Sequence, residues 1–401
     1  MKQKSLILLG VLITINCFSQ QEKVIVNKDS LSIKQIRHPQ SPEPKYQKYA
    51  ISGYVKLVST FDVGPNIKNT GAFKNSDIPV NPNKLQEKSR LSFDARQTRV
   101  GFDGNFTAGN EHIHTYVETD FYSSETLNNY SLRLRLAYIN VWKFHIGRDW
   151  TTFANLEATP NQVDFQGANS SPTIRNEMIR FVHDLNKKTT LNIAVETHNS
   201  DFTPLVQDDP GYVSFPDLVS NITHTDDWGQ LSFAKMFRDI SYLNAELDTK
   251  HEFGYGLNVA GYINTFKTAN GTKHDKLMFM GVTGKGISHY ILDISGLGLD
   301  AVSLAANKLT ALKAGGGYLA YEHWWNDKMS STLVGSHVSV EDVNQQLPNI
   351  YKSASYLEAN YIATPLENFH VGIAYLYGNH RLQNKDKGNA SRIQAMFQYS
   401  F

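Results

Sequence analysis

The chain ends with SRIQAMFQYSF (residues 391–401), in which apolar and polar side chains alternate. One parity carries the apolar set Ile393, Ala395, Phe397, Tyr399 and Phe401. The other parity is polar apart from Met396. A repeat of two residues is that of a β-strand, whose successive side chains point to opposite faces. The stretch therefore predicts a terminal strand that closes a barrel against the first strand and turns three aromatic rings toward lipid.

The same alternation recurs along the chain in segments separated by connections that are short and long in turn. The sixteen predicted strands are 50–63, 90–103, 111–122, 131–141, 143–150, 174–184, 189–199, 217–225, 229–238, 252–264, 274–284, 311–321, 327–336, 353–363, 368–378 and 390–401. Links such as 184–188 are turn-like, whereas 64–89 and 151–173 are long. Tight turns at one rim and long loops at the other are typical of outer-membrane barrels. The sequence predicts an all-β protein, a transmembrane antiparallel β-barrel of about 16 strands with short periplasmic turns and long extracellular loops.

The first residues, MKQKSLILLGVLITINCFSQ, begin with lysines, continue through an apolar run at 6–15 and end in small or polar residues. This pattern predicts a secretory signal peptide over 1–20, because the apolar run is too short to span a bilayer; a membrane anchor is the alternative. Cys17 is the only cysteine and lies inside this segment. The exported chain then has no disulfide, so burial and hydrogen bonds must stabilise it.

Residues 21–48 are charged and end in a Pro-rich stretch, which predicts a periplasmic linker, and the barrel is predicted over 49–401. Removing residues 1–20 takes away two lysines and no acids, so 37 basic (39 − 2) and 38 acidic residues remain, for a net charge of −1. There is no general basic field for nucleic acid. An exported barrel is expected in the outer membrane of a Gram-negative bacterium, in contact with its lipid.

Arginines alternate with apolar residues in the informative region 90–184. In SLRLRLAY, Arg133 and Arg135 alternate with leucines at 132, 134 and 136. An arginine facing lipid at the membrane midplane costs about 2 to 4 kcal/mol, so both should face the lumen. Arg99 has the opposite parity to its neighbours, which predicts a bulge near Gln97. The predicted basic pore-lining residues are Arg96, Arg99, Arg133, Arg135, Arg148 and Arg180.

Acidic and polar residues are expected beside these arginines. The predicted set is Asp94, His114, Glu118, Asp120, Asp149 and Asp164. The functional interpretation is a constriction whose arginines attract anions. The alternative is that these groups pair with one another and stiffen the wall, and both can hold. Segment 151–173 has the ordinal place of the third outer loop, which folds into the lumen in sixteen-stranded porins; a plain surface loop is the alternative.

A set of motifs spread over nearly the whole mature chain resembles the DcaP-like porins. The motifs are SGYVKL (52–57), RLSFDARQTRVGFD (90–103), HTYVETDFY (114–122), LRLRLAY (132–138), GRDWTTF (147–153), VDF (163–165), RNEMIRF (175–181) and GKGISHYILD (284–293). The resemblance implies a sixteen-stranded, trimeric outer-membrane channel that favours small anionic solutes, including dicarboxylates. Two features depart from the family. Residues 21–48 are too short and Pro-interrupted for much coiled coil, so a trimer would depend on barrel contacts, and His145 with Asp149 modifies the pore lining.

The predicted function is passive diffusion of small hydrophilic, preferably anionic solutes, with no catalytic turnover, no cofactor and no metal site. A structural anchor or adhesin barrel is the alternative, and a barrel hydrolase is a further one. A hydrolase would need a nucleophile, a base and an orienting group together at the outer rim, and no nucleophile motif stands out. His112 and His114 lack a third metal ligand. A strand ending at Phe401 also resembles the signal read by the outer-membrane assembly machinery.

Overall fold

The fold is given by a computed structural model that describes residues 46–123, 130–197, 201–203, 211–212, 214–243, 248–268, 272–305, 308–342 and 348–401. The predicted signal peptide (1–20) and the linker up to residue 45 lie outside the described residues. The first strand begins at Tyr46, three residues before the predicted start of the barrel at 49. Among the described residues, no helix is both long enough and apolar enough to cross a membrane.

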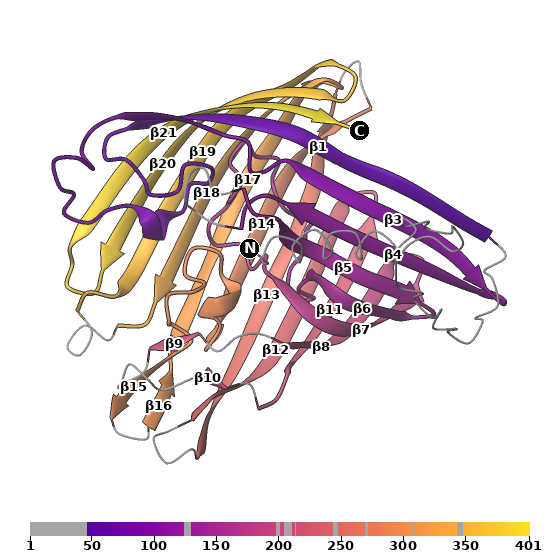
Figure 1. Ribbon diagram of the computed structural model, residues 1–401, viewed down its shortest axis with the longest axis horizontal. Helices are drawn as coiled ribbons and strands as arrows, with labels where there is room; N and C mark the ends of the chain where they lie inside the picture. The colour runs from indigo at the N-terminus through magenta and orange to yellow at the C-terminus, as the bar shows by residue number, and fades with distance from the viewer. Residues whose placement is uncertain are drawn as a thin grey trace, which may run out of the picture. The chain divides into compact units, whose positions relative to one another are not determined.

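Sixteen antiparallel strands close into one β-barrel, as predicted (Figure 1). In chain order the wall consists of β1 (Tyr46–Val63), β2 (Arg90–Asp94) continued by β3 (Arg99–Ala108), β4 (Glu111–Asp120), β5 (Arg133–Val141), β6 (Phe144–Trp150), β7 (Arg175–Asn186), β8 (Thr189–Thr197), β11 (Asp217–Asp226), β12 (Gly229–Leu243), β13 (Thr249–Lys267), β14 (His274–Lys285), β17 (Lys313–Asn326), β18 (Met329–Val340), β19 (Tyr351–Leu366), β20 (Phe369–Leu382) and β21 (Lys387–Ser400). The smaller elements are η1 (Asn75–Asp77), β9 (Phe202–Thr203), β10 (Gly211–Tyr212), η2 (Ser288–Tyr290), β15 (Ala301–Ala305) and β16 (Lys308–Ala311).

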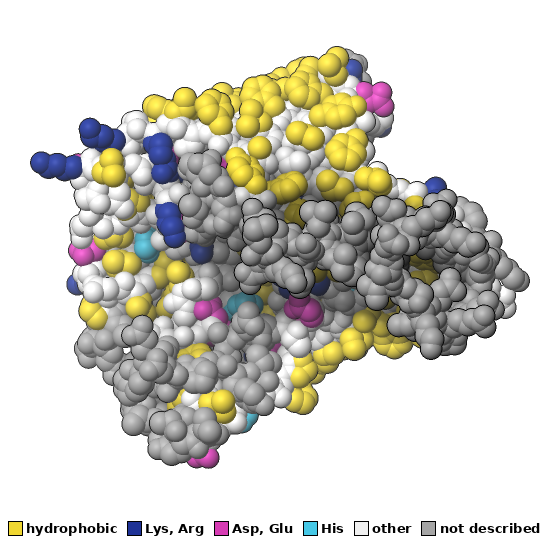
Figure 2. Space-filling model, viewed as in Figure 1, with side chains coloured by type: hydrophobic (Ala, Val, Ile, Leu, Met, Phe, Trp, Pro, Cys, Tyr) yellow, Lys and Arg dark blue, Asp and Glu magenta, His cyan; other side chains and the backbone are white. Residues whose placement is uncertain are grey.

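The last strand closes the barrel. β21 pairs with β1 from Tyr54 opposite Ser400 to Val63 opposite Ser391, and Figure 1 shows the two strands side by side. Figure 2 shows hydrophobic side chains gathered on the outer face over this seam. Phe397 is 44% exposed there, whereas Arg392 on the opposite parity is fully buried. The expected role of the C-terminal strand is confirmed, and closure leaves no unpaired strand edge in hydrocarbon.

The two rims of the barrel differ in the length of their connections, as the sequence predicts. One rim carries two-residue turns such as 142–143 and 187–188, and both ends of the barrel chain lie at this rim. The other rim carries the loops 64–89, 151–174 and 286–312. These three loops pack together: Asn75 N donates to Asn169 Oδ1 at 3.0 Å, and Asp293 N donates to the carbonyl of Asn169 at 3.0 Å.

The interior of the barrel is divided into a filled half and an open half. From β11 to β20 the inward side chains are mostly apolar or small, and the three loops cover them. Loop residues in this core include Ile67, Phe73, Phe153, Val163, Tyr290 and Ile291. Wall residues in the same core include Val219, Met236, Met278, Tyr318, Val334 and Leu376. From β1 to β7 many inward side chains are polar and partly exposed, as expected for the lining of a water-filled passage.

Loop 151–174 occupies much of the filled half, which confirms that the third outer loop folds inward. Tyr318 Oη on β17 donates to the carbonyl of Ala158 at 2.9 Å, and Asn360 Nδ2 on β19 donates to the carbonyl of Asn161 at 3.0 Å. Asn258 Nδ2 on β13 donates to the carbonyl of Phe153 in the same loop at 2.7 Å. Inward side chains of three wall strands therefore hold the loop inside the barrel.

Candidate functional site in the barrel lumen

Three guanidinium groups share two carboxylates on the inner face of β3, β4 and β5. Arg133 forms a two-pronged contact with Asp120, with Nε to Oδ1 at 2.9 Å and Nη2 to Oδ2 at 2.7 Å. Arg135 Nη1 donates to Asp120 Oδ2 at 2.9 Å, and its Nε donates to Glu118 Oε1 at 2.7 Å. Arg99 Nη1 lies 3.4 Å from Glu118 Oε1. Counting unit charges, the group carries three positive and two negative charges, so one positive charge is left over.

Local strand geometry brings these side chains together. The chain between β2 and β3 leaves the ladder over residues 95–98, and Arg99 returns to the inner face, as the predicted bulge requires. A register shift at Glu118 inserts one extra residue in β5. Leu136 then turns inward and is only 8% exposed, whereas Leu134 is 49% exposed on the outer face. Strict alternation with Arg135 would turn Leu136 toward lipid, and the structure differs because the sequence pattern does not reveal this bulge.

Aromatic rings border the same guanidinium groups. The guanidinium carbon of Arg99 lies 5.1 Å from the ring centre of Tyr54, and that of Arg133 lies 5.4 Å from the ring of Tyr122. Such contacts stabilise a cation over a ring face. They also restrict the arginine rotamers, so that the positive charges stay at the passage wall.

Two further cations beside this group escaped the sequence analysis. Lys56 on β1 is 7% exposed, and no described residue forms a hydrogen bond or ion pair with its ammonium group. Its charged neighbours are Arg99, Asp164 and Glu358. Arg175, at the extracellular end of β7, lies with its guanidinium carbon 4.7 Å from a tryptophan ring and has no ion-pair partner among the described residues. Lys56 alternates with valine and leucine in SGYVKL, so strand parity could have identified it.

A chain of polar contacts crosses the wall nearer the periplasmic rim. His114 Nε2 lies 2.7 Å from Asp103 Oδ2, and Asn140 Nδ2 lies 3.0 Å from His114 Nδ1. Because an amide nitrogen can only donate, His114 accepts at Nδ1 and donates from Nε2 to Asp103. His145 Nδ1 donates to Asn140 Oδ1 at 2.7 Å. His145 Nε2 lies 3.1 Å from Asp149 Oδ2, at ion-pair distance but without hydrogen-bond alignment.

Comparison with known proteins identifies the family. The family model of the DcaP outer membrane protein matches residues 14–401. The chain belongs to this family. No curated protein matches it. The DcaP channel of Acinetobacter baumannii is 20% identical, with a TM-score of 0.75 over 90% of this chain and 99% of that one.

Two other solved structures share the fold. An anion-selective porin from Comamonas acidovorans is 9% identical, with a TM-score of 0.58 over 89% of this chain and 100% of that one. The trimer form of OmpT from Vibrio cholerae is 10% identical, with a TM-score of 0.52 over 88% of this chain and 99% of that one. At these identities the likeness shows the fold alone. Family and fold together make this chain an outer-membrane porin of a Gram-negative bacterium.

Several residues expected to line the pore of this DcaP-family porin lie elsewhere. Arg96 is fully buried, with its Nε 3.0 Å from Asp94 Oδ1, and Asp94 is 2% exposed. Loop 64–89 covers the pair, because Thr70 Oγ1 approaches both side chains at 3.4 Å. Arg148 has the parity of the exposed Ile146, and its Nη1 lies 2.7 Å from Glu177 Oε1. Arg148 therefore belongs to an ion pair on the outer face. The alternation in FHIGRDW (144–150) already places Arg148 on the same parity as Ile146.

Asp164 lies beneath the loops and not at the passage wall. It is 4% exposed, its Oδ1 accepts from Phe73 N at 2.9 Å, and its Oδ2 accepts from Tyr356 Oη at 3.2 Å. Burial, together with the nearby Glu358 carboxylate, raises the pKa of Asp164 to about 7. Asp164 thus holds loop 64–89 and loop 151–174 against β19.

Arg180 remains on the inner face of β7. Its Nε donates to Thr152 Oγ1 at 2.8 Å, and its Nη1 lies 3.5 Å from Asp149 Oδ2. Arg180 therefore joins the wall to the start of the third outer loop, and it is less available to a solute than Arg99 or Arg133.

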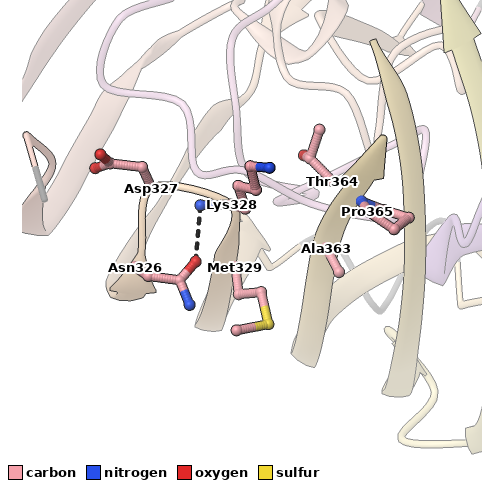
Figure 3. A pocket seen from close by; sticks show the side chains of 7 residues that line it. All are labelled: Asn326, Asp327, Lys328, Met329, Ala363, Thr364 and Pro365. Atoms are coloured by element: carbon pink, nitrogen blue, oxygen red, sulfur yellow. Dashed lines mark hydrogen bonds between the residues drawn. The ribbon is translucent and has the colours of Figure 1, made fainter. Parts of the chain in front are cut away.

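A surface pocket lies at the periplasmic rim, between the turn joining β17 to β18 and the end of β19 (Figure 3). Its dashed contact is Lys328 N donating to Asn326 Oδ1 at 2.9 Å, a bond internal to the first turn. Lys328 and Asp327 are its only charged lining residues, and both belong to one turn. Among the described residues there is also no group of three or more His, Cys, Asp or Glu side chains able to hold a metal ion. The charged wall along β1–β7 is therefore the candidate site.

Proposed function

We propose that this porin passes small hydrophilic solutes by passive diffusion and favours anions, including carboxylates, in the passage along β1–β7. The observation that carries the proposal is the excess of cations over carboxylates on the inner face of β1, β3, β4 and β5. Arg99, Arg133 and Arg135 share only Glu118 and Asp120. Lys56 adds a further positive charge whose ammonium group forms no ion pair with a described residue, while the carboxylates of Asp164 and Glu358 lie near it.

Paired arginines can still attract a passing anion. A guanidinium has five N–H donors, and Arg133 uses two of them on Asp120. Its side chain is 29% exposed, so the other donors are available to water or solute. The carboxylates keep the local charge small, so binding stays weak enough for the solute to leave, as conduction requires. Such a filter needs no cofactor and no catalytic step.

We extend the proposal to export and assembly. Residues 1–20 would direct export, 21–48 would form a periplasmic linker, and the aromatic C-terminal strand ending at Phe401 would be read by the assembly machinery. Three copies would form the working channel, as in the trimer form of the Vibrio cholerae outer membrane protein OmpT. The Comamonas acidovorans porin, which shares the fold, is anion-selective, and this supports the same solute class.

Replacing Lys56→Gln tests the proposal without breaking an ion pair. The Coulomb energy between one unit charge and a monovalent ion about 8 Å away is about 0.5 kcal/mol in the dielectric of water. An anion is attracted and a cation repelled by the same charge. Losing one charge therefore changes the difference between their free energies in the passage by about 1 kcal/mol, which is roughly fivefold in the anion/cation permeability ratio. The measurement is the reversal potential in a potassium chloride gradient across a planar bilayer.

The matched control is Lys187→Gln, at the exposed turn between β7 and β8. It should leave the reversal potential unchanged. A cation-selective wild-type channel, or a Lys56→Gln channel with wild-type selectivity, would contradict the proposal.

A further inference from the structure

The outer face of β11, β12 and β13 has an apolar surface that contains the cation Lys235. Exposed apolar side chains on this face are Leu218, Ile222, Phe233, Phe237, Leu257 and Val259. Lys235 on β12 is exposed and shares the outward parity of Phe233 and Phe237. Its cross-strand neighbours are Leu257 on β13 and Ser220 on β11. A charged group in this setting costs free energy unless an anion or water reaches it.

Nothing described in the protein compensates Lys235, since no described residue forms a hydrogen bond or ion pair with its ammonium group. The inward charges of the same strand are out of reach. Arg238, for example, is fully buried on the opposite face and pairs with Asp217. An anion that compensates Lys235 therefore has to come from outside the barrel wall.

The height of Lys235 indicates which leaflet supplies the anion. Above it on β12, Phe237 is still apolar, but the next outward residue, Asp239, already pairs with His251 at 2.9 Å. On β12 the apolar band thus ends between Phe237 and Asp239, at the rim that carries the long loops. Four residues span about 13 Å along a strand, and a lysine side chain extends toward the membrane surface when its charge lies below it. From this position the ammonium group can reach the headgroup region of the outer leaflet.

Aromatic rings at that boundary complete a lipid-facing site. Phe237 and Phe253 lie with ring centres 6.1 Å apart and 25° between their planes, and Phe253 and Tyr255 lie 6.5 Å apart at 29°. Rings at this level pack beside lipid headgroups and the upper acyl chains. An ammonium group just below such a cluster is suited to a phosphate carried by the neighbouring lipid.

We propose that Lys235, with Phe237, Phe253 and Tyr255, binds a phosphate group of a phosphorylated glycolipid in the outer leaflet. A second copy of the chain is a poorer occupant. The acidic side chains on outward strand positions of the described wall, away from the turns, are Glu177 and Asp239, and both are already paired. The inference needs only the outer-membrane location and not the proposed anion selectivity, so either can fail alone.

The test is a lipid titration of the full mature chain in a non-ionic detergent, followed by native mass spectrometry. The probes are diphosphorylated lipid A, the same lipid after enzymatic removal of both phosphates, and phosphatidylglycerol. Wild type should bind diphosphorylated lipid A about tenfold more tightly than Lys235→Gln, which corresponds to about 1.4 kcal/mol. Lys235→Arg should bind like wild type, and so should Lys328→Gln at the opposite rim. Dephosphorylated lipid A should bind wild type as weakly as lipid A binds Lys235→Gln.

Heat-modifiable migration on a gel verifies that each variant is folded, and Lys235→Arg separates loss of charge from loss of fold. Equal lipid A affinity of wild type and Lys235→Gln overturns the proposal. A change of oligomer mass in lipid-free Lys235→Gln also overturns it, because the occupant is then a second copy. Phosphatidylglycerol binding wild type as tightly as lipid A overturns the assignment to a glycolipid.

Discussion

Replacing Arg133→Ala together with Arg135→Ala is expected to remove most of the anion selectivity of the channel. The double change removes two of the three cations that share Glu118 and Asp120, so the local charge passes from +1 (3 − 2) to −1 (1 − 2). By the same Coulomb arithmetic, two charges shift the anion–cation difference by about 2 kcal/mol, more than tenfold in permeability ratio before salt screening. The reversal potential in a salt gradient should move from the anion-selective side toward zero, because Lys56 keeps one further positive charge on the wall.

Two control variants separate charge from shape. Arg133→Lys with Arg135→Lys retains the charges and should retain the wild-type reversal potential. Arg133→Gln with Asp120→Asn removes one cation and one anion, leaving the local charge at +1 (2 − 1), and should also remain anion-selective. If the double alanine variant keeps the wild-type reversal potential, these arginines are not the filter, and their role is to stiffen the wall.

Replacing Arg392→Leu is expected to cause a large loss of stability by releasing loop 64–89. Arg392 on β21 is fully buried; its Nε donates to Asp62 Oδ1 at 2.6 Å. Its Nη1 and Nη2 donate to the carbonyls of Ala72 at 3.0 Å and Asn69 at 2.8 Å. Removing one partner of a buried ion pair costs about 3 to 5 kcal/mol. The free energy of unfolding in urea with detergent micelles should fall by about that amount.

Single-channel conductance should rise in the same variant, because the released loop no longer narrows the lumen. The control is Arg381→Leu, which makes the same change at an exposed position on β20. If both variants unfold at the same urea concentration and conduct alike, Arg392 does not anchor the loop.

Strand parity explains why so much of the wall could be read from the sequence. Hydrocarbon excludes unpaired arginine, so Arg133 and Arg135 had to lie on the inner parity between apolar residues, and their partners Glu118 and Asp120 followed from the same rule. The C-terminal strand and the short turns were readable for the same reason. Arg148 shares the parity of Ile146, and its pairing with Glu177 explains how it is tolerated on the outer face.

The contents of the lumen could not be read in this way. Asp164 is buried because it binds the backbone of Phe73, a contact between residues 91 positions apart in two different loops. No periodic pattern encodes such a contact. The inward turn of Leu136 depends on a bulge, which changes the face of a side chain without changing the sequence pattern around it. The sequence therefore predicts the wall and its charges, whereas loop packing determines which of those charges reach water.

The division of the lumen into a filled and an open half is tested most directly by thiol modification. The exported chain should lack cysteine, since Cys17 lies in the predicted signal peptide. Ser52→Cys places a thiol on the inner face of β1, and Ser232→Cys places one on the inner face of β12, where the serine is 1% exposed beneath Asn155. Both changes are nearly isosteric.

The measurement is channel conductance during exposure to a negatively charged methanethiosulfonate reagent. Ser52→Cys should react and lose conductance, whereas Ser232→Cys should stay unmodified and conduct normally. Rapid modification of Ser232→Cys with loss of conductance, and none at Ser52→Cys, would place the passage on the other side of the barrel and contradict the account.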